Sequence, residues 1–299
     1  MHVQKWQLAV YVVLLARPAL ADLFSFSTGN TDGKMAAATQ PSSVGKFEIE
    51  TGDDFVLTTE TFITSATFTG LLSGGANIGA VRVEIYRVFP ADSDVGRTSG
   101  PPVFSTPQVP TRVNSPGDVE LEDRDTASGN LTFTMTALSA SFTAANSVRP
   151  GGIHPQPGQT TGGNAAVTGE EVQFNVNFTT PFDLPADHYF FVPQVELTDA
   201  AGNFFWLSAP RPIVPPGTPF PAGFTDLQAW TRDEFLDPDW LRIGTDIVGG
   251  ATPPTFNMTF SVAGTAVPEP SSYILLGTVI LAAGVISRKK RHRQEATRS

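Results

Sequence analysis

Carboxylate side chains are the groups in this sequence that come nearest to a metal-binding arrangement. They form four short acidic groups, at Asp53-Asp54, Asp92/Asp94, Asp118–Asp125 and Asp237/Asp239. Carboxylate oxygens are preferred ligands of Ca²⁺, which makes calcium the one possible cofactor. The candidate calcium ligands are Asp92, Asp94, Asp237 and Asp239. None of the groups has the D-x-[DN]-x-[DN]-G order of an EF-hand loop, and the alternative is solvated loop charge.

Aromatic side chains are the second kind of candidate, because a flat ring with a polar edge can stack on a sugar. Trp230 and Trp240 lie in a polar stretch that contains Asp and Glu, which favours exposure and makes them the candidates for sugar stacking. Other aromatic residues that could stack on sugars are Trp206, Tyr86 and Tyr189. Trp206 lies within Phe-Phe-Trp-Leu, a pattern more typical of a core strand.

Nucleophiles and transition-metal ligands are sparse. The sequence has no Cys, which excludes thiol catalysis, disulfides and Cys-ligated metal. Outside the two ends the only histidines are His154 and His188, without zinc spacing, and no G-x-S-x-G is present. The glycines of 149–152 and 160–164 do not have the spacing of a phosphate-binding loop. We therefore predict no catalytic residue and no enzymatic activity; the alternative is a carbohydrate-active enzyme that draws its paired carboxylates from the many Asp and Glu residues.

The elements that must position these residues are short strands. Strict alternation predicts strands over Leu131–Ala137, Val172–Phe178 and Thr255–Val262, each with its apolar residues facing inward. Ala80–Phe89 alternates likewise, with Val81, Val83 and Ile85 on one face and Arg82, Glu84 and Tyr86 on the other, as in a half-buried strand. Further predicted strands are Phe47–Thr51, Phe55–Thr59, Phe62–Thr69, His188–Leu197 and Phe204–Ser208.

Turn and breaker residues complete this prediction. Gly52-Asp53 is expected to turn the chain, and Asp199–Asn203 to join a hairpin-like pair of strands. Pro193 predicts an edge strand or a bulge. Thr225–Leu236 is the one expected helix. The stretches 22–43 and 90–130 are expected to be mostly irregular, with at most short edge strands.

Many short alternating strands with Gly/Pro turns indicate an all-β fold, an antiparallel β-sandwich. Three fragments resemble the opening strands of secreted bacterial jelly-roll sandwiches: Asp53–Leu57, Ile63–Phe68 and Val81–Tyr86. The resemblance implies a jelly-roll-like topology rather than an immunoglobulin-like one.

The N-terminus has the layout of a secretory signal peptide. Lys5 precedes a nine-residue apolar core, Leu8–Ala16, too short to span a bilayer. Ala19 and Ala21 form a small-x-small cleavage site, so Asp22 is the expected mature N-terminus.

The C-terminus has three parts in order: a Pro-Glu-Pro motif, an apolar run over Tyr273–Ile286, and a basic cluster. The apolar run with its flanking serines is about 26 Å long as a helix, slightly short of the roughly 30 Å hydrocarbon core. The basic cluster is a stop-transfer signal made of Arg288, Lys289, Lys290, Arg291 and Arg293. The order predicts a membrane-anchored C-terminus with a cytoplasmic tail.

These parts resemble the PEP-CTERM sorting signal of Gram-negative bacteria. The motif residues are Val267, Pro268, Glu269 and Pro270. The resemblance implies recognition and cleavage by an exosortase, a membrane cysteine protease, and release from the inner membrane to the outer envelope or the extracellular space. The alternative is a single-pass anchor that is never cut.

The predicted organisation is a signal peptide over 1–21, a β-sandwich over 22–262, a linker with the Pro-Glu-Pro motif over 263–270, a transmembrane helix over 271–287 and a tail over 288–299. Between 22 and 267 there are 11 Lys and Arg against 27 Asp and Glu, a net charge near −16. Such a surface disfavours nucleic acid as a partner. We expect a non-enzymatic structural or adhesive protein of the cell envelope or matrix, associated with exopolysaccharide.

Overall fold

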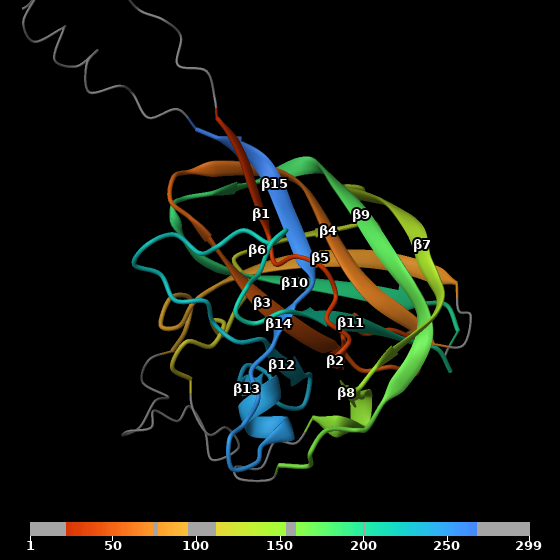
Figure 1. The fold of residues 1–299 in the computed structure, drawn as a ribbon. Coiled ribbons are helices and arrows are strands. Elements are labelled where there is room, and N and C mark those ends of the chain that lie inside the picture. Colours follow the sequence, from red (N-terminus) through yellow and green to blue (C-terminus); the bar gives the residue numbers. More distant parts are fainter. Residues whose placement is uncertain (1–21, 74–76, 95–111, 154–159, 200, 268–299) are drawn as a thin grey trace, which may run out of the picture. The chain divides into compact units, whose positions relative to one another are not determined.

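The computed structural model describes residues 22–73, 77–94, 112–153, 160–199 and 201–267. It is all-β, with two sheets, as expected for a β-sandwich (Figure 1). Leu23–Thr265 forms one compact unit. The helical elements of the described part are a 3₁₀ turn, η2 (Pro150–Gly152), and a short π-helix, η3 (Ile243–Val248).

The larger sheet has nine strands. They are β1 (Leu23–Ser27), β2 (Met35–Ala38), β4 (Thr61–Ser73), β7 (Leu131–Ala144), β8 (Asn146–Val148), β9 (Val167–Leu184), β11 (Asn203–Ala209), β14 (Asn257–Met258) and β15 (Phe260–Ala266). Its main path runs β1-β15-β4-β11-β2-β8, while β9 pairs with β4 and carries β7 on its other side. The three-residue β8 pairs parallel to β2, so the expectation of a purely antiparallel sheet is wrong at this edge.

The smaller sheet has six strands in the order β13-β12-β3-β10-β5-β6. They are β3 (Ile49–Leu57), β5 (Ile78–Arg87), β6 (Glu122–Asp125), β10 (Asp187–Leu197), β12 (Trp230–Asp233) and β13 (Leu241–Arg242). Aromatic rings join the two sheets. Phe191 of β10 stacks on Phe260 of β15 with 5.1 Å between centroids, and Trp206 of β11 packs edge-on against both rings.

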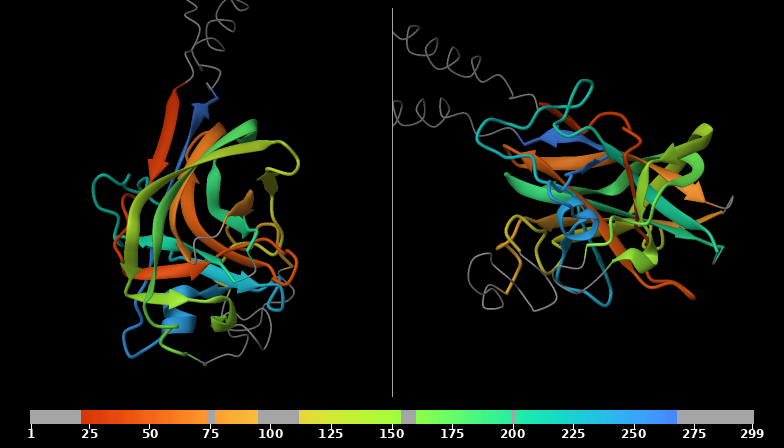
Figure 2. Two further views of the ribbon diagram at one scale, coloured as in Figure 1. Left: turned by 90° about the vertical axis from the view of Figure 1, so that its right-hand side faces the viewer. Right: turned by 60° about the horizontal axis from the view of Figure 1, so that its bottom comes forward.

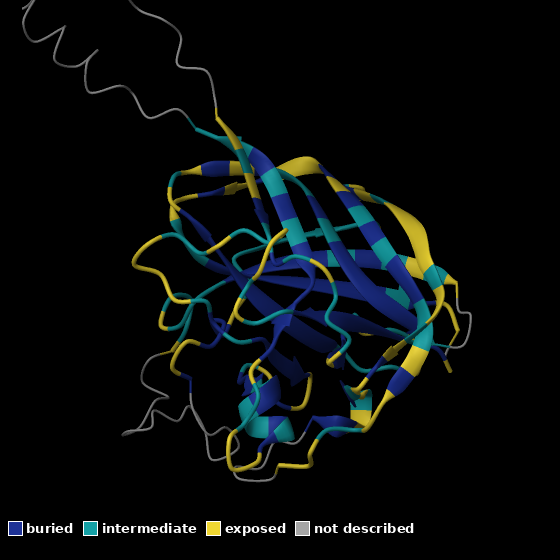
Figure 3. Ribbon diagram, viewed as in Figure 1, coloured by how far each residue is buried: buried dark blue, intermediate teal, exposed yellow. Residues whose placement is uncertain are grey.

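The six-stranded sheet is buried on both faces (Figure 3). Its inner face joins the main core, and its outer face holds a second cluster that includes Phe190, Trp230 and Trp240. The inward set Val81, Val83 and Ile85 of β5 is confirmed. The prediction that this strand is half-buried is wrong, because Glu84 and Tyr86 on the outer face are also buried.

Several local predictions are wrong because pairing partners override local sequence signals. Gly52-Asp53 is no turn: β3 passes through it, with Gly52 opposite Trp230 and Asp53 opposite Phe191. The expected helix over Thr225–Leu236 is instead the strand β12, which pairs with β3. The aromatic and β-branched residues Trp230 and Thr231 suit this strand.

Strand β10, which contains Pro193, is interior because β3 and β5 flank it, so the predicted edge position is wrong. The alternative, a bulge, has a counterpart in the same strand, where the register with β5 shifts between Val195 and Leu197. The pairing of β10 with β3 ends at Phe191, so Pro193, which has no N–H, breaks no hydrogen bond to β3. The predicted hairpin across Asp199–Asn203 is also wrong. The strands that this turn joins, β10 and β11, belong to different sheets, where their aromatic rings meet across the core.

The ends of the domain are more ordered than expected. Stretch 22–43 contributes two strands, β1 and the fully buried β2, because Met35–Ala38 packs into the core. The expected tether over 263–266 is the end of β15, which pairs with β1 through Leu23↔Thr265. These two strands lie side by side in every view (Figures 1 and 2).

Inward alternation is confirmed for Val172–Phe178 and for the apolar residues of Thr255–Val262. It fails in β7, where Met135 is 41% exposed and Ala137 is also exposed. The cause is position: β7 pairs with β9 alone among the described strands, and little covers its inner face.

Candidate ligand-binding cleft

A cleft of about 310 Å³ opens on the outer face of the nine-stranded sheet. Strands β4, β9 and β15 supply its floor, and the loop after β1 supplies one wall. Because side chains alternate along a strand, the residues between the core positions of these strands point into the cleft. The polar lining residues are Ser27, Asn30, Thr31, Thr67, Thr69, Glu171, Gln173, Thr259 and Ser261.

The lining offers hydrogen-bonding groups that the protein does not fully use. Thr31 donates to Glu171 Oε1 at 3.0 Å, and the hydroxyls of Thr67 and Ser261 are 2.7 Å apart. Thr259 is 6% exposed, and its Oγ1 has no hydrogen-bond partner among the described residues. A buried hydroxyl without a partner costs about 1–3 kcal/mol.

The charge of the cleft limits what it can bind. Glu171 is the single ionisable side chain in the lining, and no Lys, Arg or His is present there among the described residues. Leu138 and Pro216 add apolar surface. Hydroxyls, an amide and one carboxylate beside apolar patches suit an uncharged polyhydroxylated ligand and disfavour an anion.

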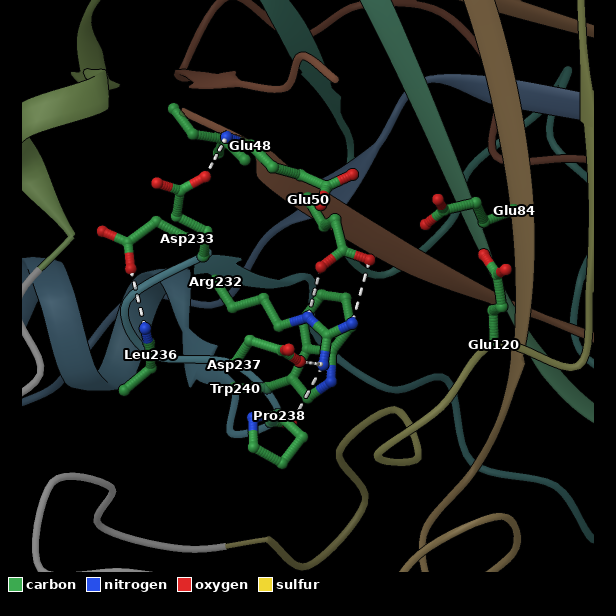
Figure 4. A network of polar contacts seen from close by, with 12 residues as sticks. Glu48, Glu50, Glu84, Glu120, Arg232, Asp233, Leu236, Asp237, Pro238 and Trp240 are labelled. Carbon is green, nitrogen blue, oxygen red and sulfur yellow. Dashed lines mark hydrogen bonds and ion pairs between the residues drawn. The ribbon is translucent and has the colours of Figure 1, made fainter. Parts of the chain in front are cut away.

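A buried carboxylate pair, Glu50 and Glu84, lies elsewhere, beside the second core cluster (Figure 4). Tyr86 Oη donates toward Glu50 Oε1 at 2.5 Å and lies 3.2 Å from Glu84 Oε2. Arg232 donates to both oxygens of Glu50 and to Tyr86 Oη, the last at 2.9 Å. Its guanidinium also stacks on Trp240, 4.3 Å from the ring centroid.

Burial and charge give the two carboxyls different protonation behaviour. Burial raises the pKa of Glu84 well above its usual range, and the neighbouring Glu50 charge raises it further. Burial acts on Glu50 as well, but the Arg232 guanidinium outweighs it and lowers the pKa of Glu50. Arg82 Nη1, 2.8 Å from Glu84 Oε1, acts in the opposite direction on the pKa of Glu84. Two carboxyls whose pKa values move in opposite directions resemble an acid–base pair, yet both side chains are closed off from solvent, with Glu84 1% and Glu50 5% exposed.

A second buried polar group surrounds His188. Its Nε2 lies 2.6 Å from Asp54 Oδ2, which also accepts from the Leu227 backbone N–H at 3.0 Å. Burial raises the pKa of Asp54 to about 6, with His188 acting in the opposite direction. Asp53 points to the other face of β3 and accepts from the Met258 N–H at 2.7 Å. Sequence reasoning treated Asp53-Asp54 as loop charge; both are interior.

The candidate calcium ligands face basic or backbone partners. Asp92 lies 3.7 Å from Arg87 Nε, and the Asp94 backbone N–H donates to Asp118 at 2.9 Å. Asp237 is 2.7 Å from Arg232 Nη1, and Asp239 is buried. Among the described residues no group of three or more His, Asp or Glu side chains is placed to hold a metal ion. Calcium binding stays a prediction.

The indole candidates are not at the surface. Trp230 and Trp240 are 1% and 2% exposed, so the expectation that they present a free stacking face is wrong. The expectation rested on polar neighbours in the sequence. In the structure two of these neighbours cover the rings: Arg232 lies over Trp240 and Arg242 lies over Trp230. Trp206 and Tyr189 are also buried.

Several predicted features lie outside the described residues. They are the sorting motif from Pro268 onward, the stop-transfer residues, the signal cleavage residues Ala19 and Ala21, and His154. Asp22 and Val267 are described, at the two ends of the domain. A search of the described residues for a helix long and apolar enough to cross a membrane found none.

Sequence reasoning missed the cleft, although a signal was present. Thr67, Gln173 and Ser261 are the polar members of three alternating strands, and only the sheet order brings them together. Comparisons with family models, curated proteins and solved structures gave no match.

Proposed function

We propose that this chain is an exported protein of the cell envelope or extracellular matrix whose sandwich holds a neutral polysaccharide in the outer-face cleft without cleaving it. Its route is export through the signal peptide, transient anchoring in the inner membrane, and processing by an exosortase-type protease at Val267–Pro270. The jelly-roll-like topology belongs to the same proposal. The proposal also includes calcium binding at an acidic loop.

The cleft is the observation that carries the proposal. It presents neutral donors and acceptors, among them the Thr67 and Ser261 hydroxyls and the Gln173 amide, and lacks a basic residue among its described lining. Glycoside hydrolysis ordinarily needs two carboxyl groups about 5–9.5 Å apart on either side of the bond. The lining holds one, Glu171, which favours binding over cleavage.

The second candidate function is a carbohydrate-active enzyme, and one observation favours it. Glu50 and Glu84 are a close carboxyl pair with opposite protonation preference. Two observations disfavour this function. Arg232 donates hydrogen bonds to both carboxylate oxygens of Glu50, and both Glu50 and Glu84 are buried, so a substrate cannot reach either carboxyl group in this structure.

The position of the domain ends supports the sorting route. The Ala266 backbone N–H donates to the Asp22 carbonyl at 2.8 Å, so the first residue after the predicted signal cleavage lies next to the last residue before Val267. Strand β15 ends at Ala266, and the sorting motif follows it directly in the sequence.

Binding is tested by screening neutral and anionic glycans against the purified protein, then measuring the hit by calorimetry. Gln173→Leu and Glu171→Gln should each weaken binding about tenfold, the size of one or two lost hydrogen bonds. Thr180→Val, an exposed change in β9 outside the cleft lining, is the control. If wild type and the three variants bind the glycan with equal affinity, the cleft is not the binding site. If the glycan is cut into shorter products, the second candidate function, a carbohydrate-active enzyme, is favoured.

Processing is tested in the native host. We expect wild-type chain to be recovered from the envelope or medium without the segment after about residue 270, and Glu269→Ala to accumulate at full length in the inner membrane. Intact-mass measurement of each fraction distinguishes the two. If wild type and variant are both found only uncut, the chain has a plain anchor and the sorting route is wrong.

A further inference from the structure

Strand β7 forms the most exposed edge of the molecule. It pairs with β9 on one side only, and no described strand pairs with its other side. The strand stands out as exposed along most of its length (Figure 3). Its apolar side chains Met135 and Leu138 are 41% and 51% exposed. A free strand edge presents a row of unpaired N–H and C=O groups, which is a template for another strand.

The other sheet edges of the described chain are short or charged. Strands β1, β8 and β13 at the remaining edges have five, three and two residues. Strand β6 has four, Glu-Asp-Arg-Asp, and all four are charged. Short length and charge are the usual protections against edge-to-edge pairing. With 14 residues and no charged side chain, β7 has neither.

The first half of β7 is the part suited to pairing. Residues Leu131–Ala137 keep a regular register with β9, whereas bulges interrupt it between Ala137 and Ser139 and again before Phe142. Bulges bend a strand and hinder further pairing, so the second half is a poor template. Leu131–Ala137 reads LTFTMTA, seven residues of high β-propensity without Pro, Gly or charge.

We infer that Leu131–Ala137 pairs with the same segment of a second copy of this chain, antiparallel, about a two-fold axis at Thr134. Antiparallel self-pairing places Thr134 opposite its copy and Phe133 opposite Met135, so every outward polar residue meets a polar one and every apolar residue an apolar one. The net charge near −16 would repel two copies elsewhere on their surfaces, and this uncharged edge is where they can approach closely. Two nine-stranded sheets then become one continuous sheet in a closed dimer.

The absence of cysteine makes the test clean. Strands paired at this distance bring opposite Cα atoms to about 4.5–5.5 Å, within the range that a disulfide spans. In the full chain, purified in mild detergent, Thr134→Cys should form a disulfide-linked dimer under mild oxidation. Asn177→Cys is the control, because Asn177 is equally exposed but lies one strand inside the edge.

A charge variant tests the same pairing without a cross-link. Thr134→Lys puts two like charges opposite each other at the axis and should raise the dimer dissociation constant about tenfold or more in sedimentation, while Asn177→Lys should not. Added salt should strengthen the wild-type dimer by screening the net negative charge. Melting temperatures of the variants check that each remains folded.

Three results would overturn the inference. One is a monomer at all concentrations with no more Thr134→Cys cross-link than the Asn177→Cys control. Another is a dimer that tolerates Thr134→Lys and does not cross-link at 134, which places the interface elsewhere. The last is cross-linking of Thr134→Cys in the native envelope to a different protein alone, which assigns the edge to a foreign strand.

Discussion

Removing the Arg232 guanidinium should destabilise the domain strongly, because its carboxylate partner cannot reach water. Arg232 is 4% exposed and donates to Glu50, Tyr86 and the Pro238 carbonyl, the last at 3.1 Å (Figure 4). In Arg232→Met the stem volume is largely kept, but Glu50 is left buried without its counter-ion. Leaving one member of a buried ion pair costs about 3–5 kcal/mol.

The double variant Glu50→Gln/Arg232→Met separates this cause from lost packing. It removes both charges of the Glu50–Arg232 pair, and the other charged partner of Arg232, Asp237, has a side chain that is 55% exposed and stays hydrated. We therefore expect it to be less destabilised than the sum of its single variants by about 2 kcal/mol or more. Urea unfolding at pH 7 gives the free energies, and a fall in melting temperature of roughly 6–20 °C should accompany Arg232→Met at this domain size.

An ion pair with an exposed lysine supplies the comparison. Lys34 lies 3.3 Å from Asp32 with its side chain 63% exposed, and Lys34→Met should cost under about 1 kcal/mol. The lowered pKa of Glu50 gives a further check: its stabilisation is present above the ordinary carboxyl pKa and is lost as pH falls through the lower folded value. If the single variants are additive within about 0.5 kcal/mol, Glu50 and Arg232 do not act as a pair and this reasoning is refuted.

Two further predictions concern the interior. Burial raises the pKa of Asp54 to about 6, so the folded state holds more protons than the unfolded state between about pH 4 and 6, and stability should fall as pH rises through that window. Asp54→Asn should flatten the profile there, as measured by urea unfolding at several pH values; an unchanged slope would contradict the shift. Gly70→Ala places a Cβ into the Phe204 ring and should lower stability by about 1–3 kcal/mol, whereas Gly151→Ala meets open space and should be near neutral in the same thermal melts. Equal melting temperatures for these two variants would contradict the close packing at Gly70.

The strand content could be predicted because alternation is a local property. Val172, Phe174 and Val176 face the core as their spacing indicates. The inward face of β5 follows the same rule. The sheet to which each strand belongs could not be predicted, because it depends on which strand, distant in the sequence, pairs with it. Strand β12 shows this: its four residues are too few to identify a strand, and pairing with β3 defines it.

Polar residues were the least predictable part, because their meaning depends on what covers them. The outer faces of β3 and β5 carry Glu50, Glu84 and Tyr86, a pattern that reads as solvent-facing. Arg232 and Trp240 come from the far end of the chain and bury that face, and their side chains satisfy the polar groups they cover. Trp240 was therefore misplaced at the surface for the same reason that Glu50 was overlooked.

The edge strand β7 is the opposite case. Its register with β9 places Phe133 and Met135 opposite the core residues Val176 and Phe174. Met135 is nevertheless exposed, because nothing in the described domain closes the sheet beyond this strand. A sequence can specify which side of a strand is apolar without supplying the surface that covers it. For β7 a second copy of the same segment provides the matching pattern, and its pairing would cover backbone groups that this chain alone leaves open.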